Sequence, residues 1–378
     1  MSQRSPGKRR TALIARQARI FAAIALPLLS AGCANVEELE KFALEGDQYS
    51  THASASSTSS IAPGQFNAEP IPIPGTQLLA VESIITGGNQ ADNGMVGQFR
   101  RLAAGAVSEI HLSRPVAVGG VDNLLYIVDA VQGTIFKYDL STQQFLPMKD
   151  LGVNFNGDPG NIYVTKDHSF YVVDSSGRQV LHFSEDGDLL GKYQDLANLS
   201  RPMDVLVHEP SGEVYVADGS FSHIVVFSPL GNALRAVGRR GTGEGRFRAI
   251  TSMTAGDDGI YVLDRLELPV QVFTWDGVFR YSFGVGDLTY PTAVAVDQHQ
   301  RVYISDQIDN MIRVYQDGQL LEKIGDTGNQ PGQFRMVTGM WASGDRLYVA
   351  DSLNHRVQVL KIRDDSRIPG IGMVQGLQ

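Results

Sequence analysis

The sequence predicts an all-β fold built from six similar units, and three observations support this. First, a strand-like phrase that ends in aspartate, such as "YVADG" or "YVADS", occurs six times. Second, apolar and polar residues alternate with period two beyond Leu79, as half-buried strands require. Third, 40 glycines and 16 prolines supply many turns. The six aspartates are Asp129, Asp174, Asp218, Asp264, Asp306 and Asp351.

The steps between these aspartates are 45, 44, 46, 42 and 45 residues. Such a period in a β-rich chain is typical of a propeller with one four-stranded blade per repeat. In one repeat the inner strand is "PTAVAVD" (Pro291–Asp297), and the aspartate phrase follows it. The third strand is "MIRVYQDG" (Met311–Gly318) and the fourth is "LLEKIG" (Leu320–Gly325). The sequence therefore predicts a six-bladed β-propeller.

A glycine-rich segment that ends in phenylalanine connects some of the repeats. It occurs at Gly238–Phe247, Gly325–Phe334 and Gly87–Phe99. Glycine permits positive φ in a tight crossover, and we expect the phenylalanine to fill the wedge between two blades. The first copy, "GRRGTGEGRF", is not a phosphate-binding loop, because no Lys-Ser/Thr pair and no helix follow it.

The two ends of the repeat region suggest how the ring closes. The segment "LLAVESIIT" (Leu78–Thr86) resembles an outer strand, whereas the sixth repeat ends after its third strand. We therefore expect the N-terminal strand to complete the last blade and to remove its open edge. This places the propeller at residues 78–365 and a C-terminal tail at 366–378. An insertion at Ala103–Ser113 could cap one face.

The first 33 residues have the pattern of a targeting segment. Basic residues precede the apolar run Ile20–Leu29, which is too short to span a bilayer. The following "SAGC" (Ser30–Cys33) resembles a bacterial lipobox and contains the only cysteine of the chain. This resemblance implies a signal peptide at 1–32 and acylation of Cys33, including palmitate. An ordinary secretory signal followed by an unrelated cysteine is the alternative.

The resemblance to lipoproteins also implies a location. In that family Asp after the cysteine signals retention in the inner membrane, and here the residue is Ala34. We therefore expect a lipid anchor in the outer membrane, with the protein facing either the periplasm or the exterior. Residues 33–77 are expected to be a flexible linker, because "STHASASSTSS" (Ser50–Ser60) cannot bury enough apolar surface to fold. "PIPIPG" (Pro70–Gly75) is a stiffer, extended piece of that linker.

The net charge narrows the possible partners. The formal charge is −9, and removal of the six basic residues before Cys33 would bring it to −15. A chain this acidic repels nucleic acid, and it disfavours general adhesion to anionic lipid. We expect no nucleic-acid partner.

The repeats resemble those of the NHL family of β-propellers over roughly Leu78 to Ile362. The likeness is strongest in "GQFRMVTGMWASGDRLYVADSLNHRVQVL" and "RPMDVLVHEPSGEVYVADGSFSHIVVFSPLG". It implies the fold and says little about function, because this scaffold carries enzymes, peptide binders and RNA binders.

The blade phrases are also similar to those of the amidating lyase that processes peptidyl-hydroxyglycines. That resemblance implies zinc-binding histidines just after the inner-strand proline. None of the matching residues is a histidine, so the zinc site is not expected. The residues are Val116, Met203, Thr251, Thr292 and Thr338.

The sequence offers few other residues that could form a catalytic or metal-binding site. We expect the repeat aspartates to bond the backbone of the corner that follows each of them. Asp204 is the clear carboxylate on an inner strand, with Asn161 as a possible companion, and two oxygen ligands do not make a calcium site. No Ser/His/Asp or Cys/His arrangement stands out. We therefore expect no catalytic residues, no cofactor and no metal.

Four arginines occur one or two residues before inner strands: Arg114, Arg201, Arg248 and Arg335. Equivalent points of different blades converge on one end of the channel. An arginine-rich channel mouth, together with Asp204, could hold a carboxylate, a phosphate or an acidic loop of a partner. The alternative is that each arginine pairs with an acidic neighbour in its own blade.

The sequence favours a membrane-anchored propeller that acts as a scaffold for a protein, a peptide or an envelope polymer. The alternative is a metal-dependent hydrolase or lyase centred on the channel. The channel lining separates the two, because convergent metal ligands would favour the enzyme. The inner strands show Val, Ala, Thr and Met with one Asp, which favours the scaffold.

Overall fold

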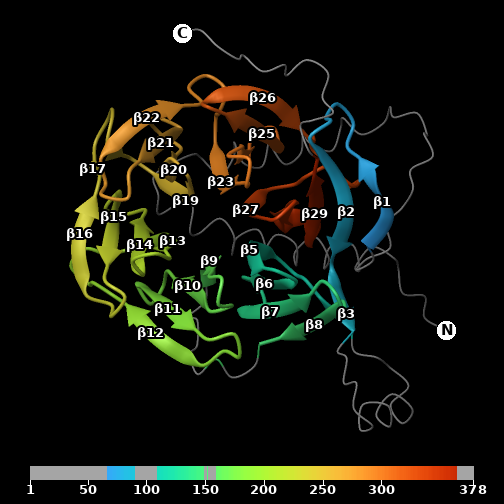
Figure 1. Cartoon of the computed structure of the whole chain (residues 1–378), viewed down its shortest axis with the longest axis horizontal. Helices are drawn as coiled ribbons and strands as arrows, with labels where there is room; N and C mark the ends of the chain where they lie inside the picture. Colours follow the sequence, from blue (N-terminus) through green and yellow to red (C-terminus); the bar gives the residue numbers. More distant parts are fainter. Residues whose placement is uncertain (1–65, 90–108, 149–150, 152–158, 364–378) are drawn as a thin grey trace, which may run out of the picture. The chain divides into compact units, whose positions relative to one another are not determined.

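The computed structural model describes residues 66–89, 109–148, 151 and 159–363 (Figure 1). Within them the regular structure consists of strands and one short 3-10 turn at Ser352–Asn354. Six sheets of four or five antiparallel strands surround a central axis. The prediction of an all-β, six-bladed propeller is confirmed. No helix in the described residues is long and apolar enough to cross a membrane.

Each blade begins with the strand nearest the axis and proceeds outward. Blade 1 contains β5 (Pro115–Val121), β6 (Leu124–Asp129), β7 (Thr134–Asp139) and β8 (Gln144–Pro147). Blade 2 contains β9 (Pro159–Val164), β10 (Phe170–Asp174), β11 (Gln179–Phe183) and β12 (Leu189–Tyr193). Blade 3 contains β13 (Pro202–His208), β14 (Glu213–Asp218), β15 (His223–Phe227) and β16 (Ala233–Val237). Blade 4 contains β19 (Ile250–Gly256), β20 (Gly259–Asp264), β21 (Val270–Phe273) and β22 (Phe279–Phe283). Blade 5 contains β23 (Pro291–Val296), β24 (Val302–Asp306), β25 (Met311–Gln316) and β26 (Gln319–Ile324). Blade 6 contains β27 (Val337–Ser343), β28 (Arg346–Asp351) and β29 (Arg356–Ile362), with two further strands given below.

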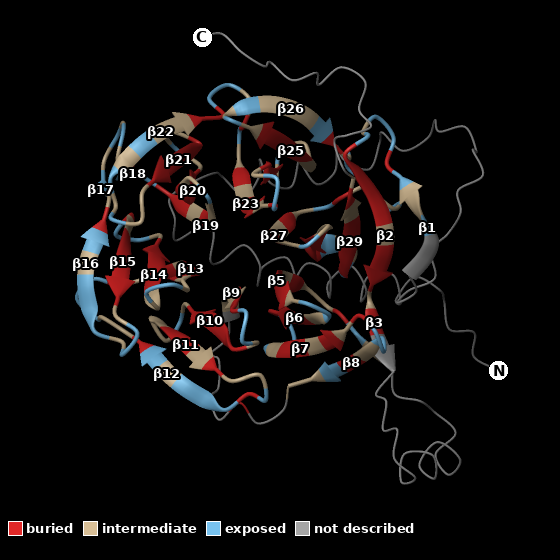
Figure 2. Ribbon diagram, viewed as in Figure 1, coloured by how far each residue is buried: buried red, intermediate tan, exposed pale blue. Residues whose placement is uncertain are grey.

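The burial of a strand follows its place in the blade (Figure 2). Second strands such as β10 and β28 are almost completely buried, whereas outermost strands such as β12 and β16 are largely exposed. The core consists of apolar layers between adjacent blades. Tyr215 and Val226 of blade 3, for example, share one such layer with Ile260 and Phe273 of blade 4. Removal of these faces from water is the main force that holds the blades together.

Two strands from the N-terminal side belong to blade 6. β2 (Leu79–Ile85) pairs antiparallel with β29, with Leu79 opposite Ile362. β1 (Phe66–Pro72) pairs with the other edge of β2. The expected linker 33–77 therefore overlaps a strand. The reason is that Ile73, just after β1, is buried in the apolar layer between blades 5 and 6, and the proline-rich sequence around it does not reveal this burial.

Several expected segments lie outside the described residues. They are the signal peptide 1–32, the acylated Cys33, the linker as far as residue 65, and the tail 366–378. The insertion Ala103–Ser113 is described only from residue 109. There, β4 (Glu109–His111) pairs with β3 (Gly87–Asn89).

Two glycine-rich crossovers have the predicted design. Gly238 and Gly325 adopt φ of 71° and 82°, in the left-handed region that favours glycine. A Cβ atom would lie 2.3 Å from the ring of Phe247 in the first case and 2.5 Å from the ring of Phe334 in the second. Both phenylalanines are fully buried between blades, so the predicted wedge-filling role is confirmed.

Candidate functional site

Within the described residues, five of the six repeat aspartates hold two parts of their blade together, and the sixth, Asp174, accepts from the Gly177 amide of its own corner. In blade 3, Asp218 Oδ2 accepts hydrogen bonds from the amides of Ser200 and Arg201 at 2.6 and 2.7 Å. Its Oδ1 accepts from the amides of Ser220 and Phe221 at 2.9 and 2.6 Å. The carboxylate is fully buried. Asp129, Asp264, Asp306 and Asp351 also bond backbone amides just before the inner strand of their own blade. The predicted structural role of these aspartates is confirmed.

These bonds define one face of the propeller. Asp129, Asp218, Asp264, Asp306 and Asp351 each join the residues just before the inner strand to the corner between the second and third strands. The channel mouth and the corners therefore lie on the same side, because neighbouring strands run antiparallel. We call this side the corner face. It comprises the corners 130–133, 175–178, 219–222, 265–269, 307–310 and 352–355 and the residues that precede the inner strands.

The four predicted arginines share the corner face but come from four different blades. Their positions are fixed by the backbone, since each amide donates to the repeat aspartate of its own blade. Arg201, Arg248 and Arg335 are exposed, and their side chains make no hydrogen bond or ion pair within the described residues. Arg114 is half-buried and has interactions of its own. In the alternative, each arginine pairs with an acidic neighbour in its own blade. Within the described residues, the three exposed arginines form no such pair.

Exposed apolar side chains lie on the same face. Four of them follow the repeat aspartate by two residues and one follows it by three, and their exposure ranges from 42% to 65%. They are Val131, Phe221, Leu266, Ile308 and Leu353. Sequence reasoning missed this set, although its fixed distance from the aspartate is a signal that could have revealed it. Apolar residues gathered beside free cations are typical of a surface that contacts a partner.

Asp204 is buried in the wall of the channel and is only 2% exposed. Its Oδ2 accepts from Ser252 Oγ at 2.8 Å and from the Met253 amide at 2.7 Å, both on β19. Its Oδ1 accepts from the Val205 amide, and Asn161 of β9 also bonds the carboxylate. Burial raises the pKa of Asp204 to about 6 in spite of these bonds, each of which lowers it.

The structure thus brings together the two predicted channel residues, Asp204 and Asn161. Their contacts join three neighbouring inner strands, β9, β13 and β19, through protein donors. Across the described part of the chain, no three His, Cys, Asp or Glu side chains gather as a metal site would require. Asp204 lies in the channel wall, and none of the three exposed arginines bonds it.

Two of the residues that match the zinc positions of the amidating lyase bond a neighbouring blade. Thr251 Oγ1 donates to the carbonyl of Pro291 at 3.2 Å, and Thr292 Oγ1 donates to the carbonyl of Val337 at 2.7 Å. In both cases the acceptor is the first residue of the next inner strand. These hydroxyl groups therefore link blades.

One Ser/His/Asp cluster, missed in the sequence, lies in blade 2. Ser169 Oγ lies 3.0 Å from His182 Nε2 and 2.9 Å from Asp167 Oδ1. In a catalytic triad the carboxylate would orient the histidine, whereas here it bonds the serine. Ser169 is 6% exposed, and its hydroxyl also bonds Thr165. Burial lowers the pKa of His182, in keeping with a neutral ring inside a structural network.

The sequence matches no family model and no curated protein. Solved structures of the same fold include a streptogramin B lyase at 11% identity, where 67% of this chain covers 95% of that chain with a TM-score of 0.53. A Bacteroides thetaiotaomicron protein of unknown function is 13% identical, with coverages of 67% and 70% and a TM-score of 0.54. An auxiliary nutrient binding protein from the same organism is 11% identical, with coverages of 67% and 70% and a TM-score of 0.52. At such identities the likeness establishes the propeller fold alone, and the resemblance to NHL repeats stays a prediction.

Proposed function

We propose that this protein is a propeller scaffold of the cell envelope that binds a protein, a peptide or an envelope polymer through its corner face. One observation carries the proposal: Arg201, Arg248 and Arg335 are exposed and unpaired within the described residues, beside the exposed apolar corners. The blades beneath them are rigid, because the repeat aspartates fix the backbone at each corner. A rigid frame that carries variable corners suits recognition.

The anchor is part of the same proposal. Cys33, acylated after removal of residues 1–32, would hold the protein in the outer membrane, and the residues that follow would place the propeller at some distance from it. The support is the lipobox pattern around Cys33 and the residue Ala34. A Cys33→Ser variant should leave the membrane fraction and should not incorporate labelled palmitate. Retention of this variant in salt-washed membranes would contradict the anchor.

We propose that β2 serves as the fourth strand of blade 6, so that the two ends of the repeat region close the propeller. Its antiparallel pairing with β29 supports this role. β1 then covers the edge that β2 would otherwise expose.

The binding function can be tested by photo-crosslinking in intact cells. A photoreactive amino acid is placed at Ile308 or Leu353 on the corner face, and in matched variants at Leu230 or Val278. The two control residues are more exposed than Ile308 and Leu353, and they lie in turns between third and fourth strands, at the opposite end of their blades. We expect a discrete crosslinked species from the corner-face variants alone. Equal crosslinking from both ends, or from the control end only, would contradict the proposal.

The alternative function is a metal-dependent hydrolase or lyase centred on the channel. The fold shared with a streptogramin B lyase is what favours it, and this likeness extends to the fold only. Elemental mass spectrometry on the full chain, purified without chelators, separates the two functions. A stoichiometric metal that is lost in an Asp204→Ala variant would support the enzyme, and a metal-free protein would favour the scaffold.

A further inference from the structure

A loop with four exposed arginines crosses the corner face between blades 3 and 4. We call it the arginine loop, residues 238–248. It contains Arg239, Arg240, Arg246 and Arg248, which are all exposed. Within the described part of the chain none of their side chains makes a hydrogen bond or an ion pair, whereas Arg235 nearby pairs with Glu213 at 2.6 Å. This is a local excess of positive charge on a chain whose net charge is −9.

The backbone of the arginine loop is held firmly. β17 (Arg239–Arg240) pairs in parallel with β18 (Arg246–Phe247), so that Arg239 lies opposite Arg246. The Gly245 amide donates to Gln271 Oε1 at 2.9 Å, and Gln271 Nε2 donates to the Arg246 carbonyl at 2.7 Å. The fixed backbone holds the points from which the arginine side chains extend, so no backbone entropy of the loop is lost when a ligand binds them.

Two exposed apolar residues flank the loop. Phe221 belongs to the corner of blade 3, where the neighbouring Ser222 Oγ donates to the Arg248 carbonyl at 3.2 Å. Leu266 belongs to the corner of blade 4, where Glu267 Oε1 accepts from the Gly243 amide at 3.0 Å. The arginine loop is therefore bonded to both corners and lies between an exposed aromatic and an exposed aliphatic side chain.

The nearby charges leave most of the arginines available. Arg265 contacts Tyr290, through a hydrogen bond to the hydroxyl and by stacking 5.0 Å from the ring centre. Glu244 within the loop and Glu267 beside it are the acidic groups of these two segments, against four exposed arginines. Adjacent guanidinium groups repel one another until anions lie between them, and each can bind a carboxylate through two parallel hydrogen bonds.

We propose that the arginine loop, with Phe221 and Leu266, is the docking site for an acidic segment of a partner protein that also carries apolar side chains. This rests on the proposed scaffold function and gives it a partner class. A phosphate-bearing polysaccharide would neutralise the arginines but would leave Phe221 and Leu266 without contacts. An anionic bilayer would meet repulsion from the rest of this acidic chain. A peptide with carboxylates and apolar residues satisfies both parts of the surface.

The test is selection of peptides from a phage-displayed random library on the full chain in detergent. Selected peptides should be enriched in Asp and Glu together with Leu, Ile or Phe. Their affinity should fall ~10-fold or more in an Arg239→Glu/Arg240→Glu variant, because two charge-assisted contacts are replaced by repulsion. A matched Lys192→Glu/Lys323→Glu variant changes the net charge equally at exposed lysines of outer strands and should bind normally. A Phe221→Ser/Leu266→Ser variant should also weaken binding.

The possible results separate this inference from the function on which it rests. Peptides without acidic enrichment, or peptides that bind the arginine variant as well as the wild type, would overturn the docking site and leave the scaffold function standing. No enriched peptide, together with no crosslink from the corner face, would overturn both. Arginine-dependent binding to vesicles of phosphatidylglycerol without any enriched peptide would assign the loop to lipid and overturn the peptide proposal. Unchanged unfolding midpoints in all variants show that the fold is intact.

Discussion

Asp204 shows how strongly a single carboxyl group depends on the strands around it. Its oxygen atoms receive hydrogen bonds from Ser252 and from the amides of Val205 and Met253, which favour the charged form. Its burial disfavours that form more strongly, so the pKa rises from 3.8 to about 6. Folding therefore favours protonation of this group.

This shift predicts a pH dependence of stability. A pKa that is higher in the folded protein than in the unfolded chain contributes stability that is complete below about pH 4. The contribution is lost as the pH rises through about 6. Its full size is on the order of 3 kcal/mol, because the shift is about two units. Urea unfolding at pH 4 to 7 should show this decline when the wild type is compared with a variant that does not titrate at residue 204.

An Asp204→Asn variant is the control for the pH experiment. Its amide oxygen can accept from Ser252 and Met253 as the protonated acid does, but it does not titrate. The difference in unfolding free energy between wild type and variant should therefore fall from pH 4 to pH 7. Carboxylates with a lowered pKa, such as Asp258 and Glu213, act in the opposite direction in both proteins and cancel. A difference that does not change with pH would show that Asp204 is charged in the fold at pH 4.

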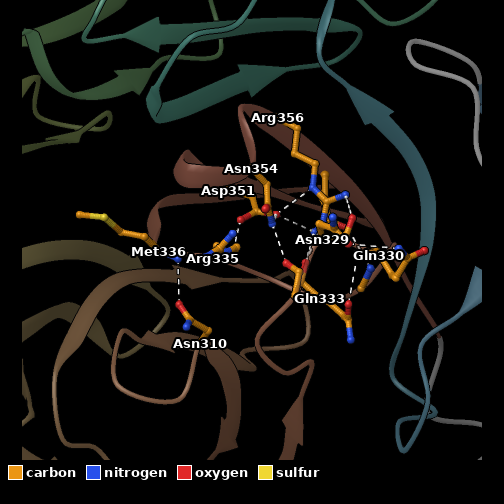
Figure 3. Close-up of polar contacts among 12 residues, drawn as sticks. Asn310, Asn329, Gln330, Gln333, Arg335, Met336, Asp351, Asn354 and Arg356 are labelled. Atoms are coloured by element: carbon orange, nitrogen blue, oxygen red, sulfur yellow. Dashed lines mark hydrogen bonds and ion pairs between the residues drawn. The ribbon is translucent and has the colours of Figure 1, made fainter. Parts of the chain in front are cut away.

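Arg356 is a second residue whose contacts predict how much it contributes to stability (Figure 3). Its Nε donates to Asp351 at 2.8 Å, and its Nη atoms donate to the carbonyls of Asn329, Gln330 and Gln333. An Arg356→Met variant would leave a buried carboxylate and three loop carbonyls without this partner. We expect a loss of roughly 3–5 kcal/mol in the free energy of unfolding.

Arg335 provides the matched control, since it lies beside the same aspartate but contributes only its backbone amide. Its side chain is exposed, so Arg335→Met should change the unfolding free energy by less than about 0.5 kcal/mol. Chemical denaturation of both variants makes the comparison. Similar losses would mean that charge on this face, and not the buried contacts of Arg356, stabilises blade 6.

At the scale of the element, the glycine-rich crossovers share a partner that sequence reasoning did not find. Gln271 of β21 and Gln358 of β29 each follow the repeat aspartate of their blade by seven residues. Each accepts from a glycine amide of the crossover, at 2.9 Å in both cases. Each also donates to a carbonyl near the end of that crossover. Both are fully buried.

This contact predicts that the crossover is fixed from the third strand. A Gln271→Leu variant should lose roughly 1–3 kcal/mol, because the Gly245 amide and the Arg246 carbonyl then lack a protein partner. Hydrogen exchange of the Gly245 amide should become faster. Gln319→Leu, at an exposed position of β26, should change neither quantity. Protection of Gly245 that survives in Gln271→Leu would mean that the β17–β18 pairing alone holds the loop.

At the scale of the whole molecule, the repeat could be predicted because the second strand of every blade ends in an aspartate that bonds nearby backbone. This requirement places an aspartate at regular intervals in the sequence. The glycine and phenylalanine of the crossovers could be predicted, because a positive φ and an apolar ring between two blades are requirements of the crossover itself. Gln271 could not, since its partners lie about 25 residues upstream. β1 was not predicted, because its prolines indicate an extended chain but do not indicate the strand with which it pairs.

The candidate site was readable only in part. The arginines before the inner strands were predicted from their place in the repeat, but exposure decides which of them is available. Arg114 is half-buried, whereas Arg201 is exposed, and this depends on neighbours from other parts of the chain. The exposed corners such as Leu266 were missed, because an apolar residue in a β-rich sequence is expected in the core.

The proposed closure of the ring leads to a prediction for the whole propeller. Five apolar residues of β2 are almost completely buried, and burial of each large apolar side chain contributes about 1.5–3 kcal/mol. They are Leu79, Ala80, Val81, Ile84 and Ile85. Their sum is comparable to the total stability of a typical domain, which is about 5–15 kcal/mol. Loss of β2 would also leave the buried strand β29 as an open edge.

We therefore expect different results from two truncations. A chain that begins at Gly75 keeps β2 and loses β1, and it should stay folded and monomeric with a lower unfolding midpoint. A chain that begins at Gly87 loses both strands, and it should aggregate or lack a cooperative transition. Size-exclusion chromatography and thermal unfolding make the comparison. If the shorter chain stayed monomeric with the midpoint of the longer one, the remaining blades would be stable without this strand, and β2 would merely cover the edge of a ring that is already complete.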